Sequence, residues 1–135
     1  MPLPLLTALI VRAPGDVNSK KKLCRHRKNL VASRLAQEPG NRVHYYGQDG
    51  SPALAQRRIF MVHYPHYAKA MALTGDYDLV CNGHEHRAVV ERVRNVKGEE
   101  TLRIDPGTVA GVSAPATYVF GDLQTLEFGI RPVPL

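Results

Sequence analysis

Two short apolar runs constrain the fold of this chain more than any other feature. The segments RIFMVH at 58–63 and DLVCN at 78–82 each have the length of one buried strand. Pro65 follows the first run and suits the first turn of a helix that reaches about Leu73. The sequence Thr74-Gly75-Asp76 then stops this helix. A strand, a helix and a second strand in this order predict an α/β domain.

Alternating strands fill the rest of the C-terminal half. Ala88–Val96 alternates apolar and polar residues, which predicts a half-exposed strand. A turn at Lys97–Glu100 leads to a returning strand at Thr101–Ile104. The runs Thr117–Leu123 and Leu126–Ile130 predict a closing pair of strands. The predicted fold class is therefore α/β, a sandwich flanked by helices whose C-terminal half is strand-rich and mostly antiparallel.

The first third of the chain carries weaker signals. Leu5–Arg12 predicts a short buried strand. Ser19 suits the N-cap of a helix from Lys20 to about Ala36, whose apolar residues lie loosely on one side. Val43–Tyr46 predicts a further strand.

The length and composition of the chain limit its class. We expect residues 1–135 to form a single domain, because 135 residues suit one hydrophobic core. The longest apolar run, Leu3–Val11, is too short to cross a bilayer and lacks the features of a signal peptide. No CxxC motif accompanies Cys24 or Cys81, so both are expected to be reduced thiols. These features predict a cytoplasmic protein with no membrane partner.

Positive charge is concentrated in the first part of the chain. Residues 1–58 hold 11 Lys and Arg against three acidic residues, a net charge of +8, whereas residues 59–135 carry −2. The run KKKLCRHRK at 20–28 could bind nucleic-acid phosphates non-specifically. It has no interleaved aromatic residues and no reader motif. A solvated basic face is therefore the favoured interpretation, and nucleic-acid binding the lesser alternative.

Histidines follow both central apolar runs. His63 ends the first run, and Gly83 leads from the second into His84 and His86. A His-x-His pair alone is by default a pair of ordinary polar histidines. Ligands collect at the carboxyl edge of α/β sheets, however, and two strands that deliver imidazole to that edge indicate a metal site.

At this point the sequence resembles the calcineurin-like metallophosphoesterases, and most closely their small bacterial and archaeal phosphodiesterase branch, to which a non-catalytic scaffold is also related. GHEH at 83–86 matches the Gly-His-x-His signature of that family. RIFMVHYP at 58–65 is similar to its strand ending in His, and IDPGTV at 104–109 to its Asn-Pro-Gly-Ser/Thr. TYVFGDLQTLEFGI at 117–130 matches its terminal hairpin. These matches cover about residues 58–131, and we expect residues 13–57 to be a divergent, basic segment.

The resemblance implies roles for individual residues. His63 and His84 would bind one ion of a binuclear centre, and His86 would bind the other. The resemblance also implies divalent metal, with manganese expected and zinc, iron or nickel as alternatives, and a phosphate-ester substrate. Glu85 would face solvent, and His66 has no firm counterpart. Turn residues near the site would be Gly83, Asp105, Pro106 and Gly107, with Asp105 standing where the family usually has Asn.

The carboxylates of such a centre are missing from the recognised motifs. The family supplies them through an Asp-x-His, a Gly-Asp and a Gly-Asn-His/Asp motif in its N-terminal half, and no Asp-x-His occurs here. The best match to the third motif, VRAPGD at 11–16, puts Pro14 where a metal-binding Asn should stand, and proline has no side-chain oxygen. We therefore expect the chain to begin near the third core strand of the family fold.

Two functions follow from this pattern. The first is a metal-dependent phosphoesterase that hydrolyses phosphodiesters or phosphomonoesters, diverged or truncated, with weak or absent activity. The second is a non-catalytic scaffold on the same fold, which binds a partner chain or a second copy at an open sheet edge. No catalytic residue beyond the metal ligands is identified.

Overall fold

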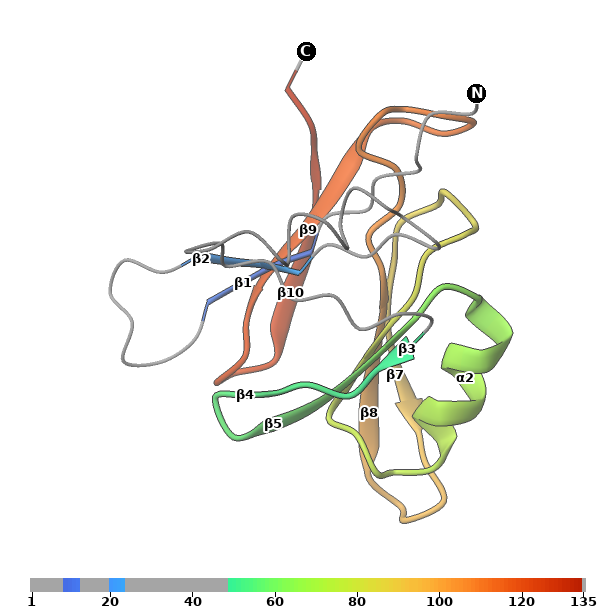
Figure 1. Cartoon of the computed structure of the whole chain (residues 1–135), viewed down its shortest axis with the longest axis vertical. Helices are drawn as coiled ribbons and strands as arrows, with labels where there is room; N and C mark the ends of the chain where they lie inside the picture. Colours follow the sequence, from blue (N-terminus) through green and yellow to red (C-terminus); the bar gives the residue numbers. More distant parts are fainter. Residues whose placement is uncertain (1–8, 13–19, 24–48, 135) are drawn as a thin grey trace, which may run out of the picture.

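The computed structural model of the chain describes residues 9–12, 20–23 and 49–134, with side chains described from residue 49 onward. This part of the chain forms two β-sheets and one helix (Figure 1). One sheet has the order β10-β9-β1-β2, and the other has the order β3-β5-β6-β8-β7 with β4 paired to β5. Mixed α/β architecture agrees with the predicted fold class.

The second sheet holds the strands that were predicted from the two apolar runs. β5 spans Arg57–Val62, β6 spans Leu79–Cys81 and β8 spans Glu100–Asp105. These three strands are parallel neighbours, with Phe60 opposite Val80 and Val80 opposite Arg103. Their carboxyl ends therefore meet at one edge of the sheet. The remaining strands of this sheet are antiparallel to their neighbours: β7 (Val89–Arg94), β3 (Asp49–Gly50) and β4 (Ala53–Leu54).

Helix α2, Pro65–Leu73, covers one face of this sheet. Pro65 stands in its first turn, where a missing N–H costs nothing, and Thr74 caps its end through its own N–H to Met71 O. Its small residues Ala68 and Ala72 are fully buried against the sheet. The side chains that they meet are Phe60, Val62 and Val80.

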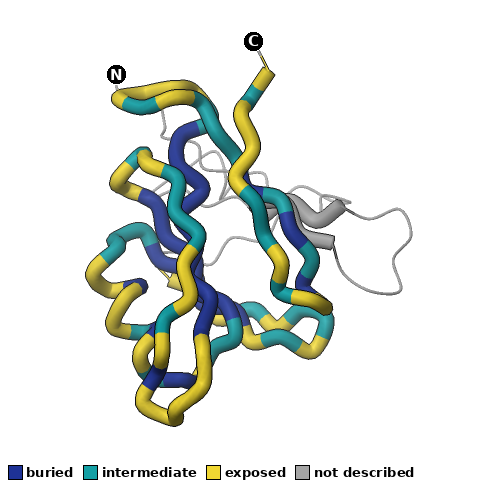
Figure 2. The backbone as a smooth tube through the Cα atoms, turned by 180° about the vertical axis from the view of Figure 1, so that it is seen from behind, coloured by how far each residue is buried: buried dark blue, intermediate teal, exposed yellow. Residues whose placement is uncertain are grey.

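The opposite face of the sheet forms the main core. Alternation along each strand sends a second set of side chains to that face, where they meet Val119 of the other sheet and Leu123, which lies outside its strands. This set consists of Ile59, Met61, Leu79, Cys81, Leu102 and Ile104. Burial raises the pKa of the Cys81 thiol, so this free cysteine is held as a neutral thiol. Figure 2 shows the contrast between the buried strand β8 and its more exposed partner β7.

The first sheet pairs the first described strand with a strand near the end of the described chain. β9 (Thr117–Asp122) pairs antiparallel with β10 (Glu127–Pro132) and parallel with β1 (Leu9–Arg12). β2, Lys20–Leu23, then pairs antiparallel with β1 and ends the sheet order.

The helix predicted from Lys20 is wrong over Lys20–Leu23, which is strand β2. Pairing with β1 supplies backbone hydrogen bonds that outweigh a weak helical preference, and lysines are common in strands at a sheet edge. The rest of that prediction, residues 24–36, lies outside the described residues. So do residues 5–8 of the predicted first strand, and the strand predicted at Val43–Tyr46.

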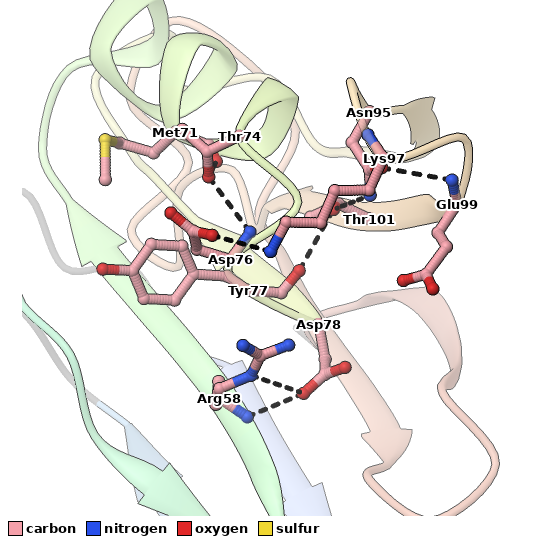
Figure 3. Close-up of polar contacts among 10 residues, drawn as sticks. All are labelled: Arg58, Met71, Thr74, Asp76, Tyr77, Asp78, Asn95, Lys97, Glu99 and Thr101. Carbon is pink, nitrogen blue, oxygen red and sulfur yellow. Dashed lines mark hydrogen bonds and ion pairs between the residues drawn. The ribbon is translucent and has the colours of Figure 1, made fainter.

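A group of hydrogen bonds centred on Asn95 and Thr101 lies at the end of the sheet away from the histidines (Figure 3), and we call it the polar brace. The buried Asn95 side chain accepts from the backbone N–H groups of Lys97 and Glu99, and it donates to Thr101 Oγ1 at 3.1 Å. Thr101 in turn donates to Tyr77 O at 3.0 Å. The β7–β8 hairpin is thereby fastened to the segment that follows α2.

No helix among the described residues is long and apolar enough to cross a lipid bilayer.

Candidate metal centre

The carboxyl edge of β5, β6 and β8 brings His63, Gly83 and Asp105 of the predicted site residues into one region. His63 directly follows β5, Asn82 and Gly83 follow β6, and Asp105 ends β8. Gly83 N donates to His63 O at 3.1 Å, which ties the two histidine segments together through the backbone. Asn82 N donates to Ile104 O at 2.9 Å and extends the ladder towards β8.

His63 and His84 form a direct pair. Nε2 of His63 lies 3.0 Å from Nδ1 of His84, and the ring centroids are 5.0 Å apart. Two imidazole nitrogens that bind one ion at about 2.1 Å lie about 3.0 Å apart if they subtend a right angle, and about 3.4 Å apart in a tetrahedral site. The contact is a hydrogen bond between the two rings, and its length is also close to the spacing of two adjacent ligands of a single ion.

The backbone of the histidine turn has an uncommon conformation. His84 has a φ of 84° and His86 a φ of 57°, both in the left-handed region. Residues other than glycine adopt this region rarely, and its cost is sustained only where the surroundings fix the chain. The turn consequently projects His84 and Glu85 to the exposed surface.

His86 lies apart from the pair and has a partner of its own. Its Nδ1 lies 3.0 Å from Val112 O. Because a carbonyl oxygen only accepts, Nδ1 must carry the proton, and a neutral ring then keeps its lone pair on Nε2. A backbone carbonyl that fixes the tautomer in this way is a frequent partner of metal-binding histidines.

Tyr64 packs against both members of the pair. Its ring centroid lies 4.8 Å from that of His63, at an interplanar angle of 87°, and 5.0 Å from that of His84, at 60°. His66 completes the cluster at 5.8 Å from Tyr64. The edge-on contact with His63 and the tilted contact with His84 restrict the rotation of both rings.

Asp105 lies beneath the turn and is fully buried. Its Oδ1 accepts from Gly107 N at 2.9 Å, and its Oδ2 accepts from Asn82 Nδ2 at 3.2 Å. Burial raises the pKa of this carboxyl from 3.8 to about 6, although the hydrogen bond from Gly107 opposes the shift.

Gly107 has a φ of 78°, and a Cβ at that position would overlap the Thr117 hydroxyl. The Asp-Pro-Gly turn therefore requires glycine here.

The described carboxylates do not complete a centre around the histidine pair. Between residues 49 and 134, no group of three or more His, Cys, Asp or Glu side chains could hold a metal ion. Asp49 stands opposite Val62, but its Oδ2 faces the Tyr67 hydroxyl at 3.4 Å. The described residues thus fit two ligands of one ion, and they do not supply a carboxylate that bridges two ions.

Sequence reasoning missed the roles of Asn82 and Arg103. Arg103 is 3 % exposed, and its Nη1 donates to Asn82 Oδ1 at 2.8 Å. Alternation predicts that every second residue of a strand faces solvent, which would leave Arg103 exposed. Both faces of β8 are covered, so Arg103 is buried instead. The one usable signal was the position of Arg103 within an otherwise apolar strand centre, TLRID.

Comparison with known proteins defines the family. The family model of the calcineurin-like phosphoesterase superfamily domain matches residues 13–126. This match extends towards the N-terminus beyond the motifs found in the sequence and includes the whole of the segment at 13–57 that was expected to diverge. A search of curated protein sequences found no match.

Solved structures agree in fold. An archaeal phosphodiesterase superimposes with a TM-score of 0.56 at 24% identity, over 67% of this chain and 54% of that one. The chain therefore spans about half the length of that phosphodiesterase. Vps29 from Chaetomium thermophilum aligns over 96% of this chain and 83% of its own, at 11% identity, but its TM-score of 0.40 is too low to support an argument.

The family match covers most of the chain, and the paired histidine segments lie at the sheet edge that the two apolar runs indicated. This chain belongs to the calcineurin-like phosphoesterase superfamily.

Proposed function

We propose that the chain is a metal-dependent phosphoesterase that hydrolyses phosphate esters slowly and holds one divalent ion between His63 and His84. The observation that carries this proposal is the 3.0 Å separation of His63 Nε2 and His84 Nδ1. Membership of the phosphoesterase family supports the reaction class and the phosphate-ester substrate.

The residues around the pair support the same chemistry. Tyr64 packs on both rings and limits their rotation, and the Gly83–His63 backbone bond keeps the two segments in register. His84 is exposed, so a phosphate ester can approach from solvent. A divalent ion held by His63 and His84 would supply hydroxide near neutral pH and offset the negative charge of a phosphoryl group.

Slow hydrolysis follows from the donor set. Two imidazoles leave most of the coordination shell to water, and the described residues offer no bridging carboxylate. His86, whose Nε2 keeps its lone pair, would serve a second ion only if ligands from other residues joined it. Manganese is the ion expected from the resemblance, while imidazole ligands alone suit zinc, iron or nickel better.

Hydrolysis of bis(4-nitrophenyl) phosphate by the purified chain tests this proposal. We expect slow turnover that requires added Mn²⁺ or Zn²⁺ and that His84→Ala abolishes. The matched control is His66→Ala, which removes an exposed imidazole from the first turn of α2 and should keep the activity. Metal-independent turnover, or full activity in His84→Ala, would refute the proposal.

A second candidate function is a non-catalytic binding scaffold on the same fold. The absence of a three-ligand group among residues 49–134 favours it. This candidate predicts no hydrolysis at any metal concentration, together with stable self-association or capture of a partner chain at a sheet edge. A clean monomer by light scattering at high concentration, with measurable turnover, would exclude it.

A further inference from the structure

A chain of hydrogen bonds, most of them buried, runs beneath the candidate metal centre. Arg103 Nε donates to Glu91 Oε1 at 2.6 Å, and Arg103 Nη1 donates to Asn82 Oδ1 at 2.8 Å. Asn82 Nδ2 donates to Asp105 Oδ2 at 3.2 Å, and Gly107 N donates to Asp105 Oδ1 at 2.9 Å. We use the name buried relay for this chain of five residues, which in bonded order are Glu91, Arg103, Asn82, Asp105 and Gly107. Its central side chains, those of Arg103, Asn82 and Asp105, are 3 %, 4 % and 0 % exposed.

The polarity of the relay is fixed by its ends. Guanidinium groups only donate, and an ionised carboxylate only accepts. Asn82 lies between them, so its amide oxygen must face Arg103 and its amide nitrogen must face Asp105. An asparagine at position 105 would present one acceptor where two donors, Asn82 Nδ2 and Gly107 N, now point. The relay therefore requires a carboxylate at position 105, because two donors point at it. Side-chain shape alone would not require one, since asparagine has nearly the same shape.

The relay is connected to the backbone on the His84 side of the turn and, through the Asp-Pro-Gly turn, to the partner of His86. Asn82 immediately precedes Gly83, and its Nδ2 also donates to Gly83 O at 3.0 Å, next to His84. On the other side, the Asp-Pro-Gly turn leads to Thr108, whose Oγ1 accepts from Val112 N at 3.3 Å. Val112 O is the partner of His86 Nδ1.

We propose that Arg103, Asn82 and Asp105 are positioning residues, whose matched donors and acceptors hold the turn that carries His84 and His86. The part of this inference that concerns metal affinity rests on the proposed function. The part that concerns the geometry of the histidine pair stands without a metal. Matched buried networks resist rearrangement because each unmatched polar group in the interior is costly.

Exchange of the two side chains tests the polarity directly. Asp105→Asn alone leaves two amide side chains facing each other, so one N–H donor points at another donor. Asn82→Asp alone leaves two carboxylates facing each other, with no donor between them. The double variant N82D/D105N restores every match along the relay. Its new carboxylate at position 82 accepts from Arg103 and from the new amide at position 105, whose oxygen accepts from Gly107 N. At the edge of the relay it replaces the donor that faces Gly83 O by a carboxylate oxygen, so two acceptors oppose each other there and the double variant should recover only part of the wild-type geometry.

A role in packing alone predicts a different result. Asparagine and aspartate have nearly the same shape, so side chains that only fill space should tolerate both single exchanges and the double exchange with little effect. Matched donors, acceptors and charges make each single variant worse than the double variant, which packing alone does not.

Two readouts separate this inference from the proposed function. In the metal-free chain, long-range ¹H–¹⁵N spectra of the imidazoles report the hydrogen bond between His63 and His84. We expect both single variants to change these signals and the double variant to return them towards wild type. In Mn²⁺ titrations at pH 7.5, each single variant should weaken affinity about tenfold or more, and the double variant should recover part of the loss.

Single variants that leave the imidazole signals unchanged, or a double variant at least as perturbed as the worse single variant, would overturn the inference. If the single variants fail to fold while the double variant folds, the polarity requirement is supported; failure of all three would contradict it. No binding of Mn²⁺ by the wild type, with imidazole signals that follow the expected order, would count against the proposed function and still support the relay.

Discussion

Nε2 of His63 lies 3.0 Å from Nδ1 of His84, although 21 positions separate the two residues in the sequence. Parallel pairing of β5 with β6 brings the segments together, and the bond from Gly83 N to His63 O sets their spacing. The left-handed backbone at His84 then turns its ring towards its partner. The pair is thus built by the backbone of the sheet edge, and its geometry depends on the side chains that surround it.

Tyr64 is expected to stabilise this pair through its ring. Tyr64→Ala removes the edge-on contact with His63 and the tilted contact with His84, so Mn²⁺ affinity should fall about two- to tenfold, the usual range for an aromatic contact. Tyr64→Phe keeps the ring and should bind the ion as the wild type does. Calorimetric titration of both variants measures the difference. A large loss in Tyr64→Phe would show that the hydroxyl carries the effect and the ring does not.

Asp105 should make folding stability depend on pH. Its folded pKa of about 6 is above the ordinary value of 3.8, so the folded state binds more protons between these values. Stability should therefore fall as pH rises from about 4 to about 6, with the penalty absent below this window and complete above it. A shift of about two pH units corresponds to about 3 kcal/mol.

Comparison with Asp105→Asn isolates this contribution. The variant cannot ionise at position 105, so its unfolding free energy relative to wild type should rise with pH across the same window, whatever offset the unmatched amide adds. Urea unfolding at several pH values between 4 and 7.5 measures the two curves. Parallel curves would show that Asp105 titrates at the same pH in the folded and unfolded chain.

Asn95 should support the fold without affecting the metal centre. Asn95→Ala removes three hydrogen bonds inside the brace and leaves buried groups without partners, which should lower stability by about 2–3 kcal/mol. Lys97→Ala removes only the exposed pair with Asp76 and should have a much smaller effect. Urea unfolding compares the two variants. Equal effects would contradict the assignment of the brace to Asn95, as would a changed Mn²⁺ affinity in Asn95→Ala.

Gly107 should be intolerant of a side chain. Gly107→Ala forces alanine into a φ of 78° and places a Cβ against the Thr117 hydroxyl, so stability should fall by more than about 1 kcal/mol. Gly98→Ala is the matched control, because Gly98 has a φ of 79° but no atom lies within 4 Å of the point where its Cβ would stand. The difference between the variants in urea unfolding measures the overlap alone. Equal losses would show that only the backbone conformation matters.

The central strand–helix–strand unit could be predicted from the sequence. Short apolar runs, a proline at the start of the helix and the Thr-Gly-Asp stop are local signals, and β5, α2 and β6 occur where these signals fall. The C-terminal strands were predicted on the same basis, because alternation and turn residues are also local.

Predictions that depend on distant pairing were less successful. Lys20–Leu23 has the pattern of a helix start, but its backbone pairs with β1, and a sequence window does not contain that partner. The buried relay has the same character. Arg103 and Asn82 are 21 positions apart, and only the parallel register of β6 and β8 places an arginine beside an amide in the interior.

The candidate site could be predicted in part. Histidines at the ends of two strands indicated the shared edge, and the structure places His63 and His84 in contact there. The separate position of His86 and the contact of Asp49 with Tyr67 could not be predicted, since each depends on how a loop or a short strand packs.

Metal binding by the histidine pair is best tested by calorimetric titration of the chelator-stripped chain with Mn²⁺. We expect one ion per chain, with binding lost in His63→Ala and in His84→Ala and retained in His66→Ala. Binding of two ions, or undiminished binding of one ion in His84→Ala, would contradict the assignment of the ion to the histidine pair.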